Sequence, residues 1–290
     1  MSKPNTIGFV GLGQMGGPMC SFIAKGPTPV VCFDQTAGLT PEGGREASSL
    51  AETVAAADTL FLSLPDGKIV NTVARDIAAL DDLAGKVVID MSTIGPAAAK
   101  EAHKTITDAG MTFIDAPVSG GRAGALKASI AIMWAGPKAE MERHQHIIDL
   151  FCKNSFHVGD DAGQAQAVKL LNNFLSATAM AASSEAVLFG LSHGVEMKTI
   201  LDVVKVSTGN NTAIADKFPN RILTGTYDAG FFAELLTKDV RLYNEFVKES
   251  GTSNLVGERV AEVWNMVEDS LPAQSDFTRV FDVLEKRTKS

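Results

Sequence analysis

The sequence has few cysteines and no long apolar run. Its three cysteines, Cys20, Cys32 and Cys152, lack the Cys-x-x-Cys spacing of redox and zinc sites, so we expect small core residues in a reducing compartment. No segment reaches the roughly 18 consecutive apolar residues that cross a membrane. The first apolar stretch, residues 7–12, is short and interrupted by glycines, which does not resemble a signal peptide. We therefore expect a cytoplasmic protein with no membrane partner.

Positive charge is also in short supply. The chain carries 26 Lys and Arg against 34 Asp and Glu, a net charge of -8. Nucleic-acid surfaces need clustered Lys and Arg, so no nucleic-acid partner is expected, although one local cluster could still bind a small anion. The five histidines are scattered; His144 and His146, two apart, fall on different faces of a helix. Neither a metal-ligand spacing nor a Gly-x-Ser-x-Gly elbow is present, so no metal site is predicted.

The first 160 residues alternate short apolar runs with helical stretches, and the remainder is helical almost throughout. Such alternation predicts parallel βαβ units in a doubly wound sheet. The predicted fold is therefore an α/β Rossmann-type domain over residues 1–162, followed by an all-α domain over residues 163–290. A long helix, over about residues 163–190, would link the two. The expected strands are residues 6–10, 30–33, 59–63, 87–90, 112–115, 129–135 and 155–158.

A glycine-rich turn follows the first expected strand and opens a helix. It reads Gly11-Leu12-Gly13-Gln14-Met15-Gly16. In dinucleotide-binding turns, one glycine makes the tight turn, one lets the backbone approach the pyrophosphate, and one allows helix and strand to pack closely. The new helix then presents free N–H groups to the phosphates. The motif alone is weak, and a plain glycine-rich turn between strand and helix is the alternative.

Asp34 ends the second expected strand, about twenty residues after the glycines, where such folds place an acid on the adenosine ribose. A carboxylate there repels a 2′-phosphate, and the next residues, Gln35 and Thr36, offer no positive charge to receive one. We therefore expect NAD as the preferred cofactor, with NADP possible. The alternative is an ordinary turn aspartate at a strand end.

Further polar residues follow other strand ends, where ligands of parallel sheets bind. Ser92 and Thr93 come after the fourth strand and could equally cap a helix. Ser119, Gly120 and Gly121 offer a hydroxyl and open N–H groups, a possible cradle for a carboxylate. A flexible glycine turn is the alternative for that loop.

Lys169 and Asn173 lie four residues apart in the expected linking helix, so their side chains share one face and can reach one cleft. Lys169 is the candidate acid/base. Without further context, a lysine and an asparagine at this spacing more often form a solvated face. The pair Lys238-Asp239, in a later helical stretch, is also predicted by periodicity alone to be solvated.

Taken in order, five stretches of the sequence resemble the β-hydroxyacid dehydrogenase family. Members include 3-hydroxyisobutyrate dehydrogenase and tartronate semialdehyde reductase, and 6-phosphogluconate dehydrogenase is a more distant relative. Each stretch is moderately specific, whereas the ordered set is highly specific and covers most of the chain. The matching stretches are residues 11–16 with Pro18-Met19, residues 90–93, residues 115–121, residues 163–173, and Lys238-Asp239.

The resemblance implies a role for each matching residue. The turn from Gly11 to Gly16 would line the pyrophosphate, and Asp34 would hold the ribose. Ser119, Gly120 and Gly121 would hold the substrate carboxylate, Lys169 would be the acid/base, and Asn173 would orient the substrate or the lysine. The other expected cofactor contacts are Leu64, Pro65, Thr93 and Lys238.

The resemblance also implies an activity: an NAD(P)-dependent oxidoreductase that interconverts a small β-hydroxyacid and its semialdehyde. Relatives form homodimers and homotetramers. The alternatives are an imine reductase-like enzyme, whose relatives generally replace the lysine, and a non-catalytic dinucleotide-binding interaction protein. The identity of the substrate stays open, and the candidate specificity residues are Asn210, Asn211, Lys217 and Phe231.

The chain departs from the family pattern at three places. Ala165 stands where a second glycine is usual, Ala128-Ser129 replaces Gly-Thr, and Leu242-Tyr243 replaces Leu-Ala. These departures bear on the local shape of the cleft and on substrate choice rather than on the reaction. Ala165 is also the first position to inspect for a shifted helix start.

Overall fold

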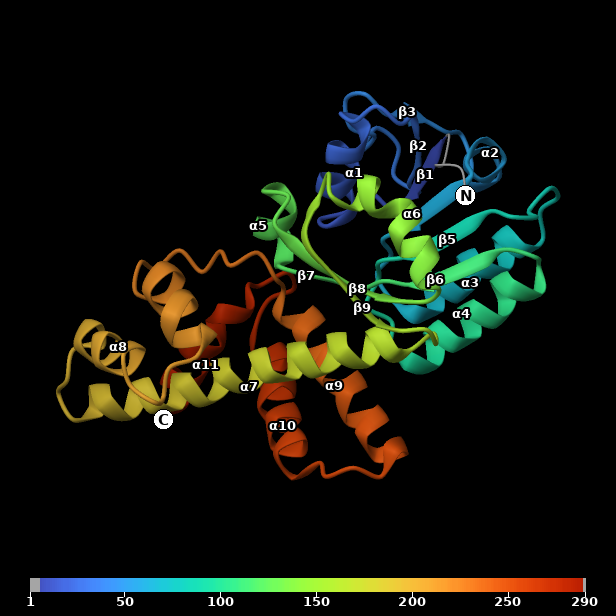
Figure 1. The fold of residues 1–290 in the computed structure, drawn as a ribbon. Helices are drawn as coiled ribbons and strands as arrows, with labels where there is room; N and C mark the ends of the chain where they lie inside the picture. The colour runs from blue at the N-terminus through green and yellow to red at the C-terminus, as the bar shows by residue number, and fades with distance from the viewer. Residues whose placement is uncertain (1–5, 289–290) are drawn as a thin grey trace. The chain divides into compact units, whose positions relative to one another are not determined.

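The computed structural model describes residues 6–288 and divides into two compact units, Met1–Lys169 and Leu170–Ser290 (Figure 1). All strands of the described chain belong to the first unit, and the second is helical, which confirms the predicted fold class. The division falls after Lys169, inside a helix, rather than after residue 162 as expected. The physical reason, described below, is that the first turns of that helix are hydrogen-bonded to the sheet.

The described part of the first unit contains one sheet and six complete helices. The strands are β1 (Ile7–Val10), β2 (Val30–Phe33), β3 (Arg45–Glu46), β4 (Thr59–Leu62), β5 (Val87–Asp90), β6 (Thr112–Asp115), β7 (Val118–Ser119), β8 (Ile130–Ala135) and β9 (Cys152–Gly159). The helices are α1 (Gly16–Ala24), α2 (Leu50–Ala56), α3 (Gly67–Ala78), α4 (Pro96–Asp108), α5 (Gly121–Leu126) and α6 (Lys138–Ile148).

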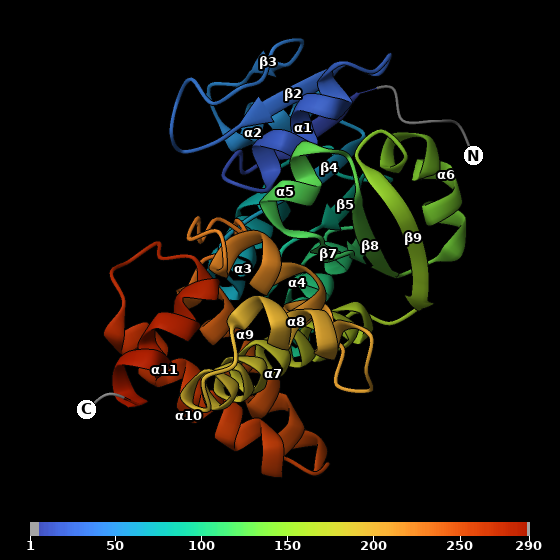
Figure 2. The ribbon, with the colours of Figure 1, turned by 90° about the vertical axis from the view of Figure 1, so that its left-hand side faces the viewer.

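The sheet runs β3-β2-β1-β4-β5-β6-β8, with β7 and β9 both paired to β8, so β3 and β9 lie at opposite edges (Figure 2). From β3 to β6 every pairing is parallel, in the order that dinucleotide-binding domains use. The strand order reverses between β1 and β4: β2 and β3 follow β1 toward one edge of the sheet, and β4 to β6 follow toward the other. Ligands of such sheets bind beyond the carboxyl ends of the strands at that reversal.

Successive side chains of a strand point to opposite faces, and each face of this sheet is covered by its own helices. On one face, Phe9 and Phe61 pack with residues of α1, α5 and α6. On the other, Val10 and Leu62 pack with residues of α2, α3 and α4 (Figure 1). Because both faces are buried, β1 and β4 read as continuous apolar runs rather than as alternating patterns.

The two-residue strand β3 was not expected from the sequence, and neither were three further features of this sheet. β8 runs antiparallel to β6, so the sheet is mixed at that end rather than parallel throughout. β9 starts at Cys152, earlier than expected, because its exposed positions hide the strand pattern. The expected loop over residues 115–124 contains β7 and the start of α5, elements too short to leave a periodic signal.

The linking helix α7 (Gln164–Ser192) begins in the first unit and continues through the second. Among residues 6–288 it alone is long and apolar enough to meet the length and composition criterion for a membrane-crossing helix. Core helices of soluble proteins meet the same criterion, and polar residues such as Gln166, Lys169 and Asn173 interrupt the apolar run.

The second unit packs its helices around one apolar core. Trp264 is fully buried there, and its indole N–H donates to the carbonyl of Ala177 on α7 at 3.1 Å. Phe218 and Phe281 meet edge to face in the same core. Its other elements are α8 (Met197–Lys205), the π-helix η1 (Ala213–Ile222), α9 (Ala233–Ser250), α10 (Leu255–Ser270), the 3-10 helix η2 (Phe277–Arg279) and α11 (Val280–Thr288).

The structure shows the backbone conformation or the contacts of the residues that depart from the family pattern. Ala128 lies in the turn before β8 with a φ of 49°, a left-handed conformation that a glycine adopts freely and that costs an alanine on the order of 1 kcal/mol. Ala165 is fully buried beside Met133 and Ala135 of β8, and α7 starts at Gln164, directly after Gly163. Tyr243 stacks on Phe174, with 4.1 Å between ring centroids.

Candidate functional site

The glycine turn after β1 has the three-part construction that a dinucleotide requires. Gly11 has a φ of 92°, and a Cβ there would lie 2.3 Å from the Ser63 carbonyl oxygen. A Cβ on Gly16 would lie 1.9 Å from the Gly11 carbonyl oxygen, so α1 can approach β1 only with glycine. Gly13 differs, because a Cβ there meets nothing within 4 Å. Its lack of a side chain serves no internal packing and leaves space beside the helix N-terminus, as a bound pyrophosphate needs.

Asp34 is tied to this turn. One carboxylate oxygen accepts a hydrogen bond from the Leu12 amide at 2.7 Å, and the other accepts from the Thr36 amide at 2.8 Å. The second bond is the aspartate turn considered above as the alternative. The first goes beyond it, since it joins the end of β2 to the glycine turn. The carboxylate therefore stands at the carboxyl ends of β1 and β2, where the adenosine ribose of a dinucleotide would lie.

The loops after β4 and β5 are joined by Ser92. The Leu64 amide donates to Ser92 Oγ at 2.8 Å, and the Ser92 amide donates to Asp90 Oδ1 at 3.0 Å. Because β4 and β5 are parallel and in register, Leu64, Pro65 and Thr93 all follow strand ends at the same edge of the sheet. This is the edge that also carries the glycine turn and Asp34.

Two buried carboxylates lie next to each other at this edge. Asp90 and Asp115 end β5 and β6 as register partners, and both are fully buried. Burial raises the pKa of Asp90 to about 7, against the hydrogen bonds from Ser92, and the neighbouring Asp115 adds to the rise. Burial likewise raises the pKa of Asp115 to about 6, against hydrogen bonds from Gln166 and the start of α7. Within the described residues Asp90 Oδ2 has no hydrogen-bond partner.

Asp115 and Gln166 attach the start of α7 to the sheet. Asp115 Oδ2 accepts from the Gly163 amide at 2.8 Å and from the Gln166 amide at 3.2 Å. Gln166 Nε2 donates to Asp115 Oδ1 at 2.7 Å. The carboxylate thus satisfies N–H groups at the helix N-terminus that have no partner within the helix. This is why the first turns of α7 belong to the first unit.

Ser119, Gly120 and Gly121 lie where β7 ends and α5 begins. Gly120 and Gly121 have φ values of 132° and 61°, which residues with a side chain rarely adopt. A Cβ on Gly120 would also lie 3.1 Å from Ile130 of β8. The glycines are therefore required by the turn itself, and the backbone N–H groups and the Ser119 hydroxyl remain candidates for an anion.

Lys169 and Asn173 are buried, with exposed fractions of 8% and 6%, so neither belongs to a solvated face of α7. Asn173 Nδ2 donates to Asp239 Oδ2 at 2.6 Å, in the second unit. Lys238 Nζ lies 3.3 Å from Asp239 Oδ1. Asp239 thus connects two residues expected to serve the site, and periodicity alone had predicted it to be solvated, although it is 2% exposed.

Sequence reasoning did not select Gln166, Asp239, Asp90 or Asp115 as functional residues. Asp239 had a usable signal, its place beside Lys238 in a family motif. Gln166 had none, because one amide among the alanines of a helix is not distinctive. The sequence pattern does not show that the Gln166 side chain is buried; this follows only from the folded structure.

Of the four candidate specificity residues, three make structural contacts, and the fourth, Asn210, has no assigned role. Asn211 Oδ1 accepts from the amides of Ala213 and Ile214 at the start of η1. Lys217 pairs with its neighbour Asp216. Phe231 packs edge to face on Phe277. For Asn210 the structure suggests no role toward a substrate.

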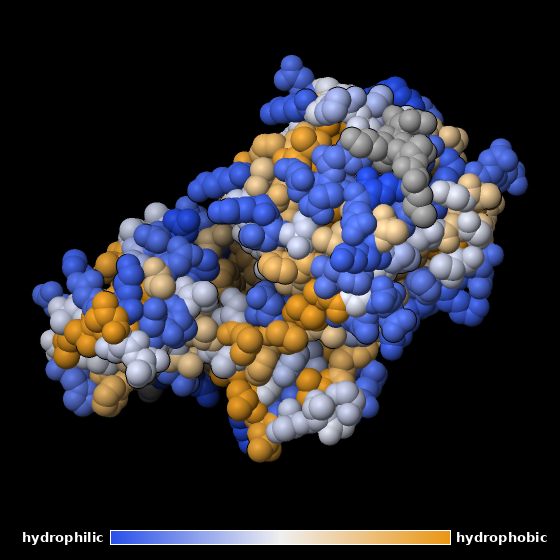
Figure 3. Space-filling view, in the orientation of Figure 1, coloured by the Kyte–Doolittle hydropathy of each residue, from blue (hydrophilic) through white to orange (hydrophobic). Residues whose placement is uncertain are grey.

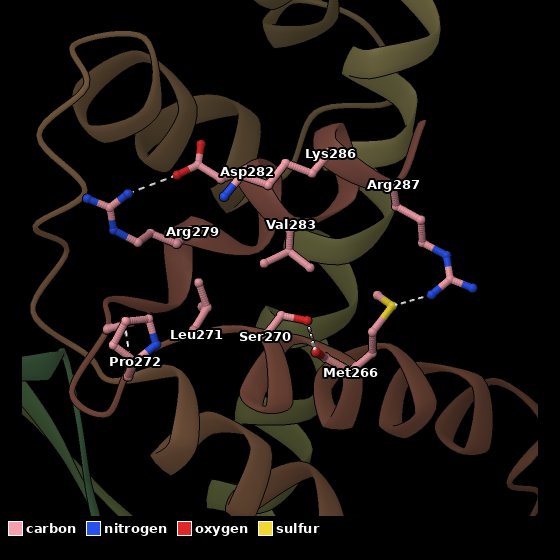
Figure 4. A pocket seen from close by; sticks show the side chains of 10 residues that line it. Met266, Ser270, Leu271, Pro272, Arg279, Asp282, Val283, Lys286 and Arg287 are labelled. Carbon is pink, nitrogen blue, oxygen red and sulfur yellow. Dashed lines mark hydrogen bonds and ion pairs between the residues drawn. The ribbon is translucent and has the colours of Figure 1, made fainter. Parts of the chain in front are cut away.

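A hollow of about 730 Å³ lies wholly in the second unit and contains none of the predicted site residues (Figure 4). Its Arg279 pairs with Asp282 at 2.9 Å and stacks on Tyr227. Arg287 is directed to the sulfur of Met266. In residues 6–288, no group of three or more His, Cys, Asp or Glu side chains could hold a metal ion. Cys20, Cys32 and Cys152 are buried free thiols, which confirms the prediction that they are core residues.

Two family models match successive parts of the chain, and they meet near residue 162 rather than at the contact-based division after Lys169. Residues 6–159 match the family model of the NAD binding domain of 6-phosphogluconate dehydrogenase. Residues 163–284 match the model described as NAD-binding of NADP-dependent 3-hydroxyisobutyrate dehydrogenase. The gap between the two models coincides with the turn before α7.

Individual relatives match over most of their length. A 2-(hydroxymethyl)glutarate dehydrogenase from Eubacterium barkeri is 34% identical over 86% of this chain and 84% of its own. An NAD-dependent L-serine dehydrogenase from Pseudomonas aeruginosa is 32% identical over 94% of this chain and 96% of its own. The structure of a Mycobacterium tuberculosis 3-hydroxyisobutyrate dehydrogenase with L-serine superposes with a TM-score of 0.89, at 30% identity, over 98% of this chain and 99% of that one.

The glycine turn allows binding and folding to be separated by two alanine substitutions. Gly13→Ala adds a methyl group to open space, so the free energy of unfolding should change by less than about 0.5 kcal/mol. NADH affinity should fall at least about tenfold, because the methyl group occupies the approach of the pyrophosphate. Gly16→Ala should instead destabilise the protein by about 2 kcal/mol or more, since its Cβ overlaps the Gly11 carbonyl. Urea unfolding and NADH fluorescence titration measure both; unchanged NADH affinity in Gly13→Ala would contradict the assignment.

Asp90 should make stability depend on pH. Its pKa in the folded protein, about 7, lies above the ordinary value of 3.8, so the folded state binds the proton more tightly than the unfolded state. Stability from this group therefore falls as pH rises from about 4 to 7, by on the order of a few kcal/mol. In Asp90→Asn that loss should disappear, whereas the exposed control Asp108→Asn should keep it. Urea unfolding at several pH values measures the difference, and a gap between wild type and Asp90→Asn that stays constant with pH would exclude it.

Proposed function

Because the chain belongs to the β-hydroxyacid dehydrogenase family, we propose that it interconverts a small β-hydroxyacid and its semialdehyde, with Lys169 as the acid/base. The observation that carries this proposal is the burial of Lys169 in a helix whose start is bonded to the ligand-binding edge of the sheet. A buried lysine in that setting does not belong to a solvated face, which supports a role in the site. The relatives named above are dehydrogenases acting on CH–OH groups.

An alcohol that becomes a carbonyl gives up a proton from oxygen and a hydride from carbon. The nicotinamide, when bound, accepts that hydride or returns it. We assign the proton to Lys169, which as a neutral amine accepts it during oxidation and as an ammonium donates it during reduction. The residues proposed to hold the dinucleotide are Gly11 to Gly16 at the pyrophosphate, Asp34 at the ribose, and Leu64, Pro65, Thr93 and Lys238 elsewhere along it. The space at Gly13 and the placement of Asp34 fit such a molecule.

The substrate carboxylate is assigned to Ser119, Gly120 and Gly121, whose turn offers backbone N–H groups and a hydroxyl. With its carboxylate bound there, the substrate would have its hydroxyl-bearing carbon between Lys169 and the nicotinamide ring. Positioning of this kind contributes heavily to rate. Asn173 would orient the substrate or Lys169, and its bond to Asp239 holds its amide in one direction.

The names of the relatives narrow the substrate class. Serine, 3-hydroxyisobutyrate and 2-(hydroxymethyl)glutarate share one unit, a carboxylate whose neighbouring carbon carries a hydroxymethyl group. They differ in the third substituent on that carbon. We propose a substrate with this unit, its third substituent to be found by assay. NAD is the proposed preference, because Asp34 would repel a 2′-phosphate.

We also propose that the chain forms a homo-oligomer through α7. Its residues Leu171, Leu175 and Phe189 are exposed, the last two by 60% and 68%, and they recur at helical spacing. Figure 3 shows hydrophobic residues on the surface in the region of α7. An exposed apolar stripe of this length typically marks an interaction surface. A second copy is the natural partner, since two-fold dimers pair the same surface on each subunit.

A cytoplasmic location is proposed from the three buried free thiols, which suit a reducing compartment. Fractionation of cells that express the tagged chain tests this. Recovery of the protein in a membrane or exported fraction would overturn it.

Two substitutions of Lys169 test the acid/base assignment. Lys169→Ala should keep NADH binding within about twofold and lose turnover by at least about 10², the usual contribution of a general acid/base. Lys169→Arg restores the positive charge but cannot release its proton at working pH, so it should be equally impaired. Lys104→Ala, at an exposed lysine paired with Asp108, is the matched control.

The assay should first screen hydroxymethyl carboxylates and their semialdehydes with NAD(H) and NADP(H), and include a cyclic imine. Near-normal turnover in Lys169→Ala would remove this residue from the role. Recovery in Lys169→Arg would reduce the role to charge alone. Turnover of the imine but of no hydroxyacid would favour the imine reductase alternative.

Sedimentation velocity tests the oligomer. Wild type should sediment as a dimer or larger, and Leu175→Glu should shift it toward monomer, because a buried unpaired carboxylate is costly. Val206→Glu, at a residue that is 85% exposed after α8, is the matched control and should leave assembly unchanged. A monomeric wild type at micromolar concentration would end the proposal.

A further inference from the structure

Gln166 is a fully buried amide at the start of α7, and every polar atom of its side chain is engaged. Oε1 accepts from the amides of Ile94 and Gly95, at 2.9 and 3.1 Å. Nε2 donates to the Ser92 carbonyl at 3.0 Å and to Asp115 Oδ1 at 2.7 Å. One side chain thus makes four hydrogen bonds, all in the interior, at the ligand-binding edge of the sheet.

The partners of Gln166 come from two separate segments of the site. Ser92, Ile94 and Gly95 surround Thr93 in the loop after β5, and Asp115 ends β6 on the way to Ser119. Gln166 itself lies three residues before Lys169, within one turn of α7. One side chain therefore connects the loop proposed to contact the nicotinamide, the strand leading to the carboxylate turn, and the helix that carries the acid/base.

The backbone around this point is equally constrained. Gly163, just before α7, has a φ of 97°, and a Cβ there would lie 3.2 Å from the Pro96 carbonyl oxygen. Its amide donates to Asp115. The start of α7 therefore packs closely against the start of α4, where a side chain at position 163 would contact Pro96. Gln166 adds hydrogen bonds from α7 to Ile94 and Gly95, the two residues just before α4.

We propose that Gln166 is a positioning residue for the reaction, one that sets Lys169 relative to the Thr93 loop. This inference rests on the proposed function, because it concerns where the proton acceptor stands when the hydride moves. Gln166 does not touch the substrate in this account and acts through Lys169 and the loop. A displacement of about 1 Å at a reacting group can cost on the order of 10² in rate.

The chemistry of the site explains why a glutamine is suited to it. The Ile94 and Gly95 amides need an acceptor, while the Ser92 carbonyl and the Asp115 carboxylate need a donor. A primary amide supplies both in a planar group. A glutamate would keep the acceptor and place a second negative charge against Asp115, whereas a methionine would fill the space and leave buried polar groups unpaired.

The experiment compares Gln166→Met and Gln166→Glu with Thr59→Val. Thr59 is also fully buried, and its hydroxyl bonds to His144 at the amino end of β4, away from the ligand-binding edge. Thermal unfolding should show comparable destabilisation in Gln166→Met and Thr59→Val. Only the Gln166 variants should lose kcat, by about 10- to 100-fold, with the Kd of NADH within about threefold of wild type. The kinetic isotope effect on kcat, measured with deuterium-labelled NADH, should also be larger in the Gln166 variants than in wild type.

A double variant tests whether the hydrogen bond between positions 115 and 166, rather than the residue type at position 166 alone, carries the effect on kcat. In Asp115→Asn combined with Gln166→Glu, the donor and the acceptor between the two positions are exchanged. The new amide at position 115 can donate to the new carboxylate at position 166 and still accept from the backbone amides that Asp115 holds. The exchange keeps every hydrogen bond of the network except the one to the Ser92 carbonyl. The double variant should recover at least about tenfold in kcat over Gln166→Glu alone, because it removes the repulsion between two buried carboxylates.

Three outcomes would overturn the inference. One is a kcat within about threefold of wild type in Gln166→Met, measured where Lys169→Ala is inactive. Another is an equal loss of kcat in Thr59→Val, which would reduce the effect to lowered stability. The third is a double variant no better than Gln166→Glu. The proposed function fails by a separate result, the absence of hydroxyacid turnover in the wild-type enzyme, so the two failures are distinguishable.

Discussion

Hydrogen bonds between the end of β6 and the start of α7 are the constraint on which the arrangement of the candidate site depends. Asp115 receives the Gly163 and Gln166 amides, and Gln166 returns a bond to it. A helix N-terminus buried without partners is costly, and so is a buried carboxylate without donors. Here the buried carboxylate of Asp115 accepts from the N–H groups at the start of α7, so both groups have partners. As a result, the first turns of a helix that continues into the second unit are fixed to the first.

The fixed helix start has a chemical consequence. Lys169 stands one turn beyond Gln166, on a segment that cannot shift without breaking buried hydrogen bonds. The same edge of the sheet holds the glycine turn and Asp34, joined by the bond from the Leu12 amide, and the loops after β4 and β5, joined by the bond from the Leu64 amide to Ser92. A site built on such strand ends is preorganised, which is the condition under which positioning contributes to rate. The raised pKa values of Asp90 and Asp115 are a cost of building it in the interior.

Much of the architecture could be predicted because its causes are local. The strands of the first unit are short apolar runs, and two glycines of residues 11–16 have local causes: Gly11 has a φ of 92°, and a Cβ on Gly16 would overlap the Gly11 carbonyl oxygen. The antiparallel pairing of β8 with β6 could not be predicted, since strand direction depends on a connection of variable length. The predicted solvation of Asp239 was wrong, because helical periodicity does not tell which face another helix will cover. The boundary expected after residue 162 lies in the gap between the two family models, whereas the first compact unit extends to Lys169 because hydrogen bonds attach the start of α7 to the sheet.

By itself the sequence determined the fold class, the family and the candidates Lys169, Asn173, Asp34 and Ser119, because these follow from residue types at fixed spacing. Only the tertiary structure decided that Lys169 and Asn173 are buried, and that Gln166 bonds to Asp115 and Ser92, which lie 51 and 74 residues from it along the chain. The physical reason is that burial and long-range hydrogen bonds are properties of elements packed together. No local pattern encodes which buried carbonyl, amide or carboxylate a side chain will meet.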